Sequence, residues 1–344
     1  MSKNDPTPRV APNASSQKVT MASIARLAGV TQPTVSRAFN HPEMLQPETL
    51  ARIMEAVRQT GYVPNMVASS LVSRKTHLLA AIVPMLSNVV YTSFLRVFSA
   101  RARDAGYQTM VFESGFSTEE EERLVEMALA RRPDGILLTG VSHSKICRLR
   151  LKSAAIPVAE VWDLHDNPID FCVGFSHSKG TQHVADYLLC KGYRRFAVIS
   201  ANDERALSRE GIFGAAISAA GLPAALCHHL PGPASIGEGR KAFASLLAQG
   251  FDKGAIFCSS DLIAHGVLVE ASVRAIDVPG QIAVMGFGDQ DFAAQIVPPL
   301  TTLNIDRALM GDEAARLLID RIEGREPENR VVDLGFRIVE RATV

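Results

Sequence analysis

Four side chains near the start of one short predicted helix, Gln32, Pro33, Thr34 and Arg37, could contact the bases of DNA. Glutamine can pair with adenine through two hydrogen bonds, and a threonine methyl group or a proline ring can touch thymine methyl groups. Their helix is the second of two that the segment 19–40, VTMASIARLAGVTQPTVSRAFN, predicts. A helix-turn-helix unit places the start of its second helix in the major groove. The segment therefore predicts a DNA-binding head.

A turn and two helix caps are predicted to hold that second helix in place. Gly29 supplies a residue that readily adopts a left-handed backbone, and Thr20 and Thr31 are predicted to cap the two helices. A third helix that ends at Gly61 completes a three-helix module over residues 19–63. The side chains predicted to face inward from the first two helices are Ile24, Ala25, Leu27, Val35 and Phe39.

The segments on either side of this module have a different character. Residues 1–18 are polar and rich in Pro and Ser, without the pattern of a signal peptide, and they predict a disordered tail. Residues 64–76 contain a short candidate helix with small residues and a basic end. Because isolated helices of this length rarely form in water, the segment is predicted to be a hinge helix that folds only when bound.

From residue 77 onward, short apolar runs alternate with helical patterns in two successive series. Such alternation predicts parallel sheets covered on both faces, here two doubly wound α/β subdomains around a common cleft. The first subdomain would comprise about 77–174 plus 303–331, and the second about 175–302 plus 332–344. The helices are expected near 91–105, 118–131, 144–154, 178–191, 208–220, 237–249 and 261–275.

Charge is unevenly distributed along a chain whose formal net charge is zero. Residues 1–76 hold nine Lys or Arg against four Asp or Glu, and the remainder holds 27 against 32. A basic head suits contact with phosphate. The five cysteines show no C-x-x-C spacing, and no apolar run approaches the ~20 residues of a membrane span. These features are typical of a cytoplasmic protein with reduced thiols and no membrane segment.

Three ordered motifs resemble the lac repressor (LacI) family of bacterial transcription regulators. Residues 20–40 fit T-x-x-x-I-A-x-x-A-G-V-T-x-x-T-V-S-R-x-x-N, and GYVPN at 61–65 is followed by Ala68 and Leu71. VPGQIAVMGF at 278–287 and PLTTL at 299–303 resemble the family's C-terminal motifs. The resemblance implies an operator-binding repressor with a periplasmic-binding-protein-like body. It also implies a homodimer, because the chain ends at Val344 without the extra leucine-rich helix of tetrameric members.

The resemblance carries DNA-binding roles onto individual positions of this chain. It makes the Gln-Pro-Thr run at 32–34 a set of base readers and Arg37 a reader of guanine. Leu71 matches the residue that the family inserts as a wedge into the minor groove. The alternative is that the Leu71 side chain packs inside a dimer interface. Asn65 and Ala68 would touch the minor groove and the partner's hinge helix. The positions expected to contact phosphate or to orient the head are Thr20, Thr31, Ser36 and Tyr62. Ser23 stands where the family usually has an acidic residue, which predicts a weaker first cap.

Within the family, several segments are most similar to gluconate-responsive repressors. They are residues 106–110, 160–163, 173–176, 203–216 and 333–336. The resemblance makes Arg209 a contact for effector hydroxyls or carboxylates, and Arg205 lies nearby. An arginine can hold a carboxylate through two parallel hydrogen bonds, although either residue could instead form a surface salt bridge.

Seven further residues are candidates for the effector cleft. Asn88 and Tyr91 follow the first strand, and Asp261 could accept a sugar hydroxyl or else cap a helix. Trp162 could stack on a sugar or belong to the core, and the remaining candidates are Glu160, Phe175 and Asp289.

Motifs of catalysis and metal binding are missing from the sequence. GFSHS at 174–178 lacks the second glycine of a nucleophile elbow, and prolines precede GEGRKA at 237–242 where a dinucleotide fingerprint needs a strand. We therefore expect no enzyme, cofactor or metal. The predicted function is repression of sugar-acid uptake and catabolism genes, controlled by gluconate or a related acid. The alternatives are the same repressor with a neutral sugar or nucleobase effector, or a solute-binding receptor.

Overall fold

A computed structural model describes residues 19–64 and 75–344 of the chain. The predicted tail over 1–18 and most of the predicted hinge helix, with Asn65, Ala68 and Leu71, lie outside the described residues. The chain divides into two compact units at Thr76. We call them the head unit, described over residues 19–64, and the body unit, residues 77–344.

The head unit is a small helical module with its own apolar core. Its elements are α1 (Met21–Ala28), α2 (Gln32–Asn40), the 3₁₀ turn η1 (Pro42–Met44) and α3 (Pro47–Thr60). Ile24, Val35 and Ile53, one from each α-helix, are fully buried together. The prediction that Leu27 faces inward is wrong, because its side chain is 58% exposed and Ala28 takes the inward position.

The two predicted caps of the head unit differ in the structure. Thr20 caps α1, and the Ser23 hydroxyl oxygen accepts a hydrogen bond from the Thr20 amide at 2.8 Å, so a serine completes the capping box. Thr31 occupies the N-cap position of α2, but its side chain caps no backbone N–H, and that prediction is wrong. Pro33 offers no N–H there, and the Thr31 hydroxyl pairs with the Thr34 hydroxyl at 2.9 Å instead.

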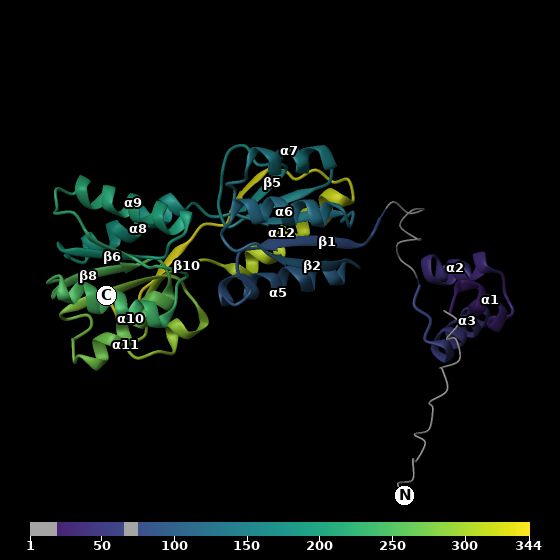
Figure 1. Cartoon of the computed structure of the whole chain (residues 1–344), viewed down its shortest axis with the longest axis horizontal. Helices are drawn as coiled ribbons and strands as arrows, with labels where there is room; N and C mark the ends of the chain where they lie inside the picture. Colours follow the sequence, from purple (N-terminus) through teal and green to yellow (C-terminus); the bar gives the residue numbers. More distant parts are fainter. Residues whose placement is uncertain (1–18, 65–74) are drawn as a thin grey trace, which may run out of the picture. The chain divides into compact units, whose positions relative to one another are not determined.

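The body unit contains two six-stranded sheets, as the alternating pattern predicted (Figure 1). The first sheet, in spatial order, consists of β11 (Val331–Asp333), β5 (Phe171–Gly174), β4 (Val158–Val161), β3 (Gly135–Thr139), β1 (Leu78–Val83) and β2 (Gln108–Glu113). The second consists of β12 (Arg337–Val339), β10 (Thr301–Asn304), β9 (Ile282–Gly288), β8 (Gly254–Cys258), β6 (Phe196–Ser200) and β7 (Leu226–His229). All neighbouring strands are parallel except β10 and β12, which the sequence did not indicate.

The chain passes between the two sheets three times, after β5, after β10 and after β11. Two crossings differ slightly from the predicted subdomain limits. Leu303 pairs in the second sheet rather than the first, and Val332 pairs in the first sheet rather than the second. Neither half of the body unit is therefore a continuous stretch of chain.

Helices cover both faces of each sheet (Figure 1). In the first half, α5 packs on α12 and α6 on α7; in the second half, α8 packs on α9 and α10 on α11. Their bounds are α5 (Val89–Asp104), α6 (Thr118–Leu129), α7 (Lys145–Ala154), α8 (His177–Cys190), α9 (Glu204–Ala219), α10 (Ile236–Ala248), α11 (Asp261–Val273) and α12 (Arg307–Ile322), with a 3₁₀ turn η2 (Asp291–Ala294).

Polar caps explain where the body helices begin. Each of the eight helices follows a Ser, Asn or Asp whose side chain accepts a hydrogen bond from the first turn. The cap at Asp203 starts α9 at Glu204, four residues before the predicted start at 208, and so brings Arg205 onto the helix.

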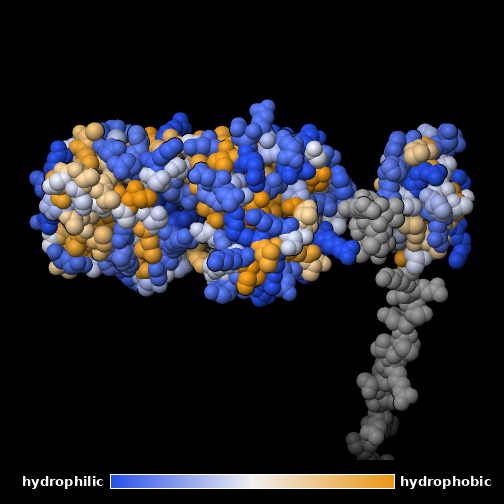
Figure 2. Space-filling model, turned by 90° about the horizontal axis from the view of Figure 1, so that it is seen from above, coloured by the Kyte–Doolittle hydropathy of each residue, from blue (hydrophilic) through white to orange (hydrophobic). Residues whose placement is uncertain are grey.

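The face drawn in Figure 2 is mostly hydrophilic, with apolar residues gathered in separate patches on both units. Among the residues that the structure describes, no helix is both long enough and apolar enough to cross a membrane.

Candidate functional site

The candidate DNA-contacting side chains lie on one face of α2. Gln32, Pro33 and Arg37 are exposed, while Thr34 and Ser36 are partly exposed. Val35 and Ala38 on the opposite face are buried in the head core and fix the helix orientation. The arrangement leaves the amide of Gln32 and the guanidinium of Arg37 available to a groove of DNA.

The residues predicted to contact phosphate or to orient the head differ in their exposure. Thr20 and Thr31 are exposed, whereas Tyr62 is partly buried with its ring 6.2 Å from the ring of Phe39. Residues 19–64 hold four arginines against three glutamates, so most of the basic excess counted over 1–76 lies outside the described part of the head.

The main cavity of the body unit lies between the two sheets and has a volume of about 270 Å³. Its walls come from the carboxyl ends of strands in both halves, where open α/β sheets bind ligands. Five of the predicted effector residues line it, namely Asn88, Tyr91, Trp162, Arg205 and Arg209. Asn88 also caps α5, accepting a hydrogen bond from the Val90 amide at 3.0 Å.

Arg209 is the most deeply placed charge in this cavity. Only 7% of the residue is exposed, and burial lowers the pKa of its guanidinium to about 10. It donates hydrogen bonds to the Nδ1 atom of His177 at 3.1 Å and to the carbonyl oxygen of Ser259 at 3.1 Å. No ion pair joins it to a carboxylate of any described residue. A buried cation normally has an anionic partner, so this guanidinium favours an anionic ligand.

His177 fixes the direction of that guanidinium. Its Nε2 atom lies 3.0 Å from the Trp162 carbonyl oxygen and must donate, which leaves Nδ1 as the acceptor for Arg209. Burial, followed by the charges of Arg209 and Arg205, holds the pKa of His177 well below its usual value. The neutral imidazole therefore adds no charge, and the cavity keeps the positive charge of Arg209.

Aromatic side chains also line the cavity. The rings of Tyr91 and Trp162 meet edge to face at 5.4 Å. Arg205 donates a hydrogen bond to the Tyr91 hydroxyl at 2.9 Å, which links α9 of the second half to α5 of the first. An apolar surface beside a few fixed polar groups is typical of small-molecule sites.

A side cavity of about 170 Å³ continues from the main one. The two share Phe116, His177, Asp203 and Arg205. The rest of the side cavity is mainly polar, and Glu121 and Asp163 contribute carboxylates to it. Burial raises the pKa of Asp163, with the Arg205 and Arg209 charges opposing that rise.

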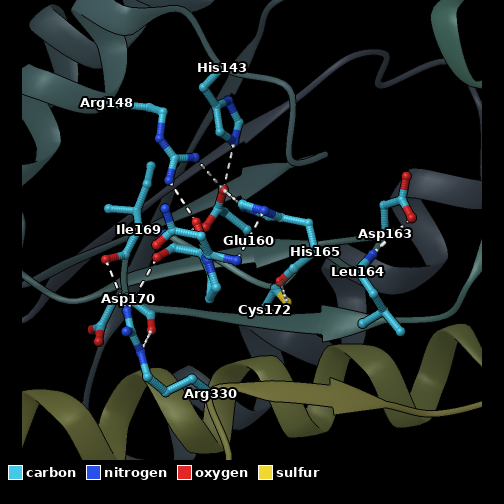
Figure 3. Close-up of polar contacts among 12 residues, drawn as sticks. His143, Arg148, Glu160, Asp163, Leu164, His165, Ile169, Asp170, Cys172 and Arg330 are labelled. Carbon is cyan, nitrogen blue, oxygen red and sulfur yellow. Dashed lines mark hydrogen bonds and ion pairs between the residues drawn. The ribbon is translucent and has the colours of Figure 1, made fainter.

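Glu160 lies away from both cavities, and its prediction as an effector contact is wrong. The residue is fully buried on β4, where its carboxylate accepts a hydrogen bond from the Ile169 amide at 2.5 Å. His143, Arg148 and His165 converge on the same carboxylate (Figure 3). Burial raises the pKa of Glu160, because the hydrogen bond from the Ile169 amide and the surrounding side chains only partly offset the loss of solvent.

Three other predicted effector contacts also do not line the main cavity. Phe175 is fully buried, with its ring 4.3 Å from His177, which it supports. Asp261 accepts hydrogen bonds from the Thr302 hydroxyl at 2.6 Å and the Gln290 amide at 2.7 Å, and the cap of its helix is Ser260 instead. Asp289 pairs with Arg341 at 2.7 Å and faces a different surface hollow.

Sequence reasoning missed several lining residues. His177, Ser259 and Phe287 follow or end the strands β5, β8 and β9, and the rule that ligands bind at strand carboxyl ends could have indicated all three. Pro231 and Pro233 also line the cavity from the loop after β7.

Comparison with known proteins adds evidence over the whole chain. Residues 20–65 match the family described as bacterial regulatory proteins, lacI family, and residues 185–344 match a periplasmic binding protein-like domain. The HTH-type transcriptional regulator GntR of Pseudomonas aeruginosa is 35% identical over 344 residues, covering 99% of this chain and 98% of that protein.

Two solved structures are similar as well. A LacI-family transcriptional regulator from Silicibacter pomeroyi has a TM-score of 0.89 at 30% identity, covering 94% of this chain and 99% of that chain. The transcription regulator GntR from Chromobacterium violaceum has a TM-score of 0.74 at 35% identity, covering 77% of this chain and 98% of that chain.

Proposed function

Because this chain belongs to the LacI family of transcription regulators, we propose that it represses genes for uptake and catabolism of gluconate or a related sugar acid. The effector would bind in the main cavity and change the affinity of the protein for its operator. The observation that carries this proposal is Arg209, a buried guanidinium in the cavity wall that forms no direct ion pair with a carboxylate of any described residue, although the charges of Asp203 and Asp163 act on it from a distance.

The chemistry of the main cavity supports an acid rather than a neutral ligand. Arg209 and Arg205 bring two permanent positive charges to the wall formed by α9, and His177 is held neutral. The aromatic rings of Tyr91 and Trp162 offer an apolar face to the carbon chain of a sugar. Two similar proteins, from Pseudomonas aeruginosa and Chromobacterium violaceum, carry the name GntR.

We propose that the DNA-bound form is a cytoplasmic homodimer on a palindromic operator. Two heads would place α2 in successive major grooves about 34–36 Å apart, with Gln32, Pro33, Thr34 and Arg37 at the bases. The segment around Leu71 would bend the operator from the minor groove. The effector acts only through its different affinity for the DNA-competent and DNA-free arrangements of the body.

The decisive experiment compares gluconate with uncharged glucose and sorbitol by calorimetric titration of the full chain. We expect gluconate to bind and the two uncharged compounds to bind far more weakly. Arg209→Gln should weaken gluconate binding by 10- to 100-fold, which corresponds to about 1.4–2.8 kcal/mol. Arg195→Gln is a matched control, because Arg195 pairs with Asp252 on the surface at 2.7 Å and should leave affinity unchanged.

The same titration separates the alternatives. Binding of a neutral sugar or a nucleobase with no response to gluconate would keep the repressor and reject the sugar-acid effector. Loss of operator binding on addition of gluconate, measured by gel mobility shift, would establish that the effector relieves repression.

A further inference from the structure

A second cluster of reactive side chains lies in the first half of the body unit. Glu121 on α6, His143 in the loop after β3 and Cys147 on α7 present ligand atoms that all lie within 4.8 Å of one another. Among the residues that the structure describes, this is the only such group of His, Cys and carboxylate side chains. The sequence did not indicate it, because the three residues belong to no spaced motif.

The cluster is shielded from solvent but not closed. The His143 side chain is 1% exposed, that of Glu121 is 13% exposed, and Cys147 is fully buried. His143 Nδ1 lies 2.7 Å from a Glu121 carboxylate oxygen, and the Cys147 thiol donates to the same oxygen at 3.6 Å. Glu121 also lines the side cavity, so one edge of the cluster faces a space of about 170 Å³.

The donor atoms suit a transition-metal ion. Nitrogen, oxygen and sulfur ligands together favour Zn²⁺ and its neighbours over Mg²⁺ or Ca²⁺. Tetrahedral Zn²⁺ with these ligands separates the donor atoms by about 3.3–3.6 Å. The 2.7 Å contact between His143 and Glu121 would lengthen by less than an ångström to admit the ion.

The far side of His143 is also arranged as in a metal site. A ligating histidine usually donates its other ring N–H to a carboxylate, which fixes the ring and strengthens the ligand. His143 Nε2 lies 3.5 Å from the Glu160 carboxylate, and Figure 3 shows the ring directed at it. Nε2 forms no hydrogen bond with any residue that the structure describes. Moving the ring proton from Nδ1 to Nε2 would free the ligand atom and supply that hydrogen bond.

We propose that Glu121, His143 and Cys147 bind a divalent transition-metal ion, Zn²⁺ by its donor preference, with an open coordination position toward the side cavity. Glu160 orients His143 in this site. Glu121 and Glu160 place two carboxylates around the ring and Arg148 one permanent positive charge, while Glu122 and Arg150 add one charge of each sign near Cys147, so acidic groups outnumber basic ones around the site. The site is distinct from the sugar-acid contacts at Arg205 and Arg209.

Metal binding requires the Cys147 thiol to lose its proton. Burial, with the nearby Glu121 charge, raises the pKa of this thiol to about 12, so the metal-free cysteine is neutral. The ion would displace that proton onto solvent and bind the thiolate.

Cobalt titration of the full-length chain tests the site directly. Reduced, chelator-treated protein should bind one Co²⁺ per chain with a thiolate-to-cobalt charge-transfer band, and Zn²⁺ should abolish that band. Cys147→Ser should remove the band, and Glu160→Gln should weaken Co²⁺ binding by about 10- to 100-fold. Neither gluconate nor DNA enters the assay, so its outcome is independent of the proposed function.

Matched cysteine variants make the result specific. Cys227 is exposed on β7 close to Glu210 and His229, so Cys227→Ser tests for binding at that surface. The proposal requires Cys227→Ser to retain the band. A band that is absent from the wild type, or that survives Cys147→Ser and disappears in Cys227→Ser, would overturn it. Should Cys147→Ser fail to fold, Glu121→Gln gives the same comparison.

Discussion

Arg209 and His177 show how a single hydrogen bond keeps a charge available for a ligand. An aspartate in the place of His177 would neutralise the guanidinium and occupy its N–H donors. The imidazole instead accepts one N–H through Nδ1, because its Nε2–H is committed to the Trp162 carbonyl oxygen. Arg209 is thus oriented without being neutralised. No sequence motif encodes this pair, since the two residues are brought together only when α8 packs on α9.

Asp261 carries the clearest pH dependence at the residue scale. Burial raises the pKa of its carboxyl from 3.8 to about 6 despite hydrogen bonds from Thr302 and Gln290. A raised pKa means that the folded chain binds the proton more tightly than the unfolded chain. The contribution of Asp261 to stability is therefore full below pH 3.8 and is lost as the pH rises through about 6, by roughly 3 kcal/mol in total.

Asp261→Asn removes that titration while an amide can still serve both hydrogen bonds. The difference in unfolding free energy between wild type and variant should change between pH 4 and pH 6 in favour of the variant and then stay constant. Urea unfolding of both proteins across this range measures it. A difference that does not vary with pH would refute the raised pKa.

At the scale of elements, periodicity located the body helices from α5 to α11 to within about four residues, but it did not indicate α12 or the strands β10, β11 and β12. It could not decide which face each strand residue occupies. Glu160 and Trp162 are two apart and were both expected at the cleft, yet Glu160 faces the α6 and α7 side. Trp162 follows the end of β4 with a backbone φ of +82°, which breaks the alternation and turns its ring into the cavity.

Gly239, in the GEGR segment, and Gly266 have a packing role that the sequence did not reveal. A Cβ atom on Gly239 of α10 would lie 2.4 Å from the Ile263 carbonyl oxygen of α11. A Cβ atom on Gly266 of α11 would lie 2.2 Å from the Ile236 carbonyl oxygen of α10. The two helices therefore touch backbone to backbone at their crossing, and this contact sets the position of the α10–α11 layer.

Gly266→Ala should destabilise the body unit by about 1–3 kcal/mol or more, because the backbone on both sides of the added methyl group must shift. Gly237→Ala is the matched control. Gly237 lies on the exposed side of α10 with no atom within 4 Å of its Cβ position, so alanine should be neutral or stabilise the helix. Thermal unfolding distinguishes the two, and equal melting temperatures would contradict the close crossing.

For the whole molecule, two hydrogen bonds join the halves of the body across the cleft. Arg205 reaches the Tyr91 hydroxyl at 2.9 Å, and Glu204 accepts a hydrogen bond from the Ser142 hydroxyl at 2.9 Å. Both contacts run from α9 in the second half to the first half. They bias the body toward an arrangement in which the effector residues of both halves already face one another.

Tyr91→Phe should weaken gluconate binding by about 3- to 10-fold, since Arg205 loses the acceptor that positions it across the cleft. Trp162 reports the binding, because it is the only tryptophan of the chain and lines the cavity. Tyr193→Phe, outside the cavity lining, serves as the control. Fluorescence titrations that give one dissociation constant for all three proteins would exclude the bridging role.

The three crossings between the sheets also determine the order in which a newly synthesised chain can complete its parts. The head core draws only on residues near the start of the chain. The first sheet, by contrast, waits for α12 to cover α5 and for β11 to pair with β5. At about 5–20 residues per second, a ribosome that has finished the head unit needs on the order of ten seconds or more to reach β11. The polypeptide thus has a finished DNA-reading module well before the half that responds to metabolite is built, and effector control is among the last properties it acquires.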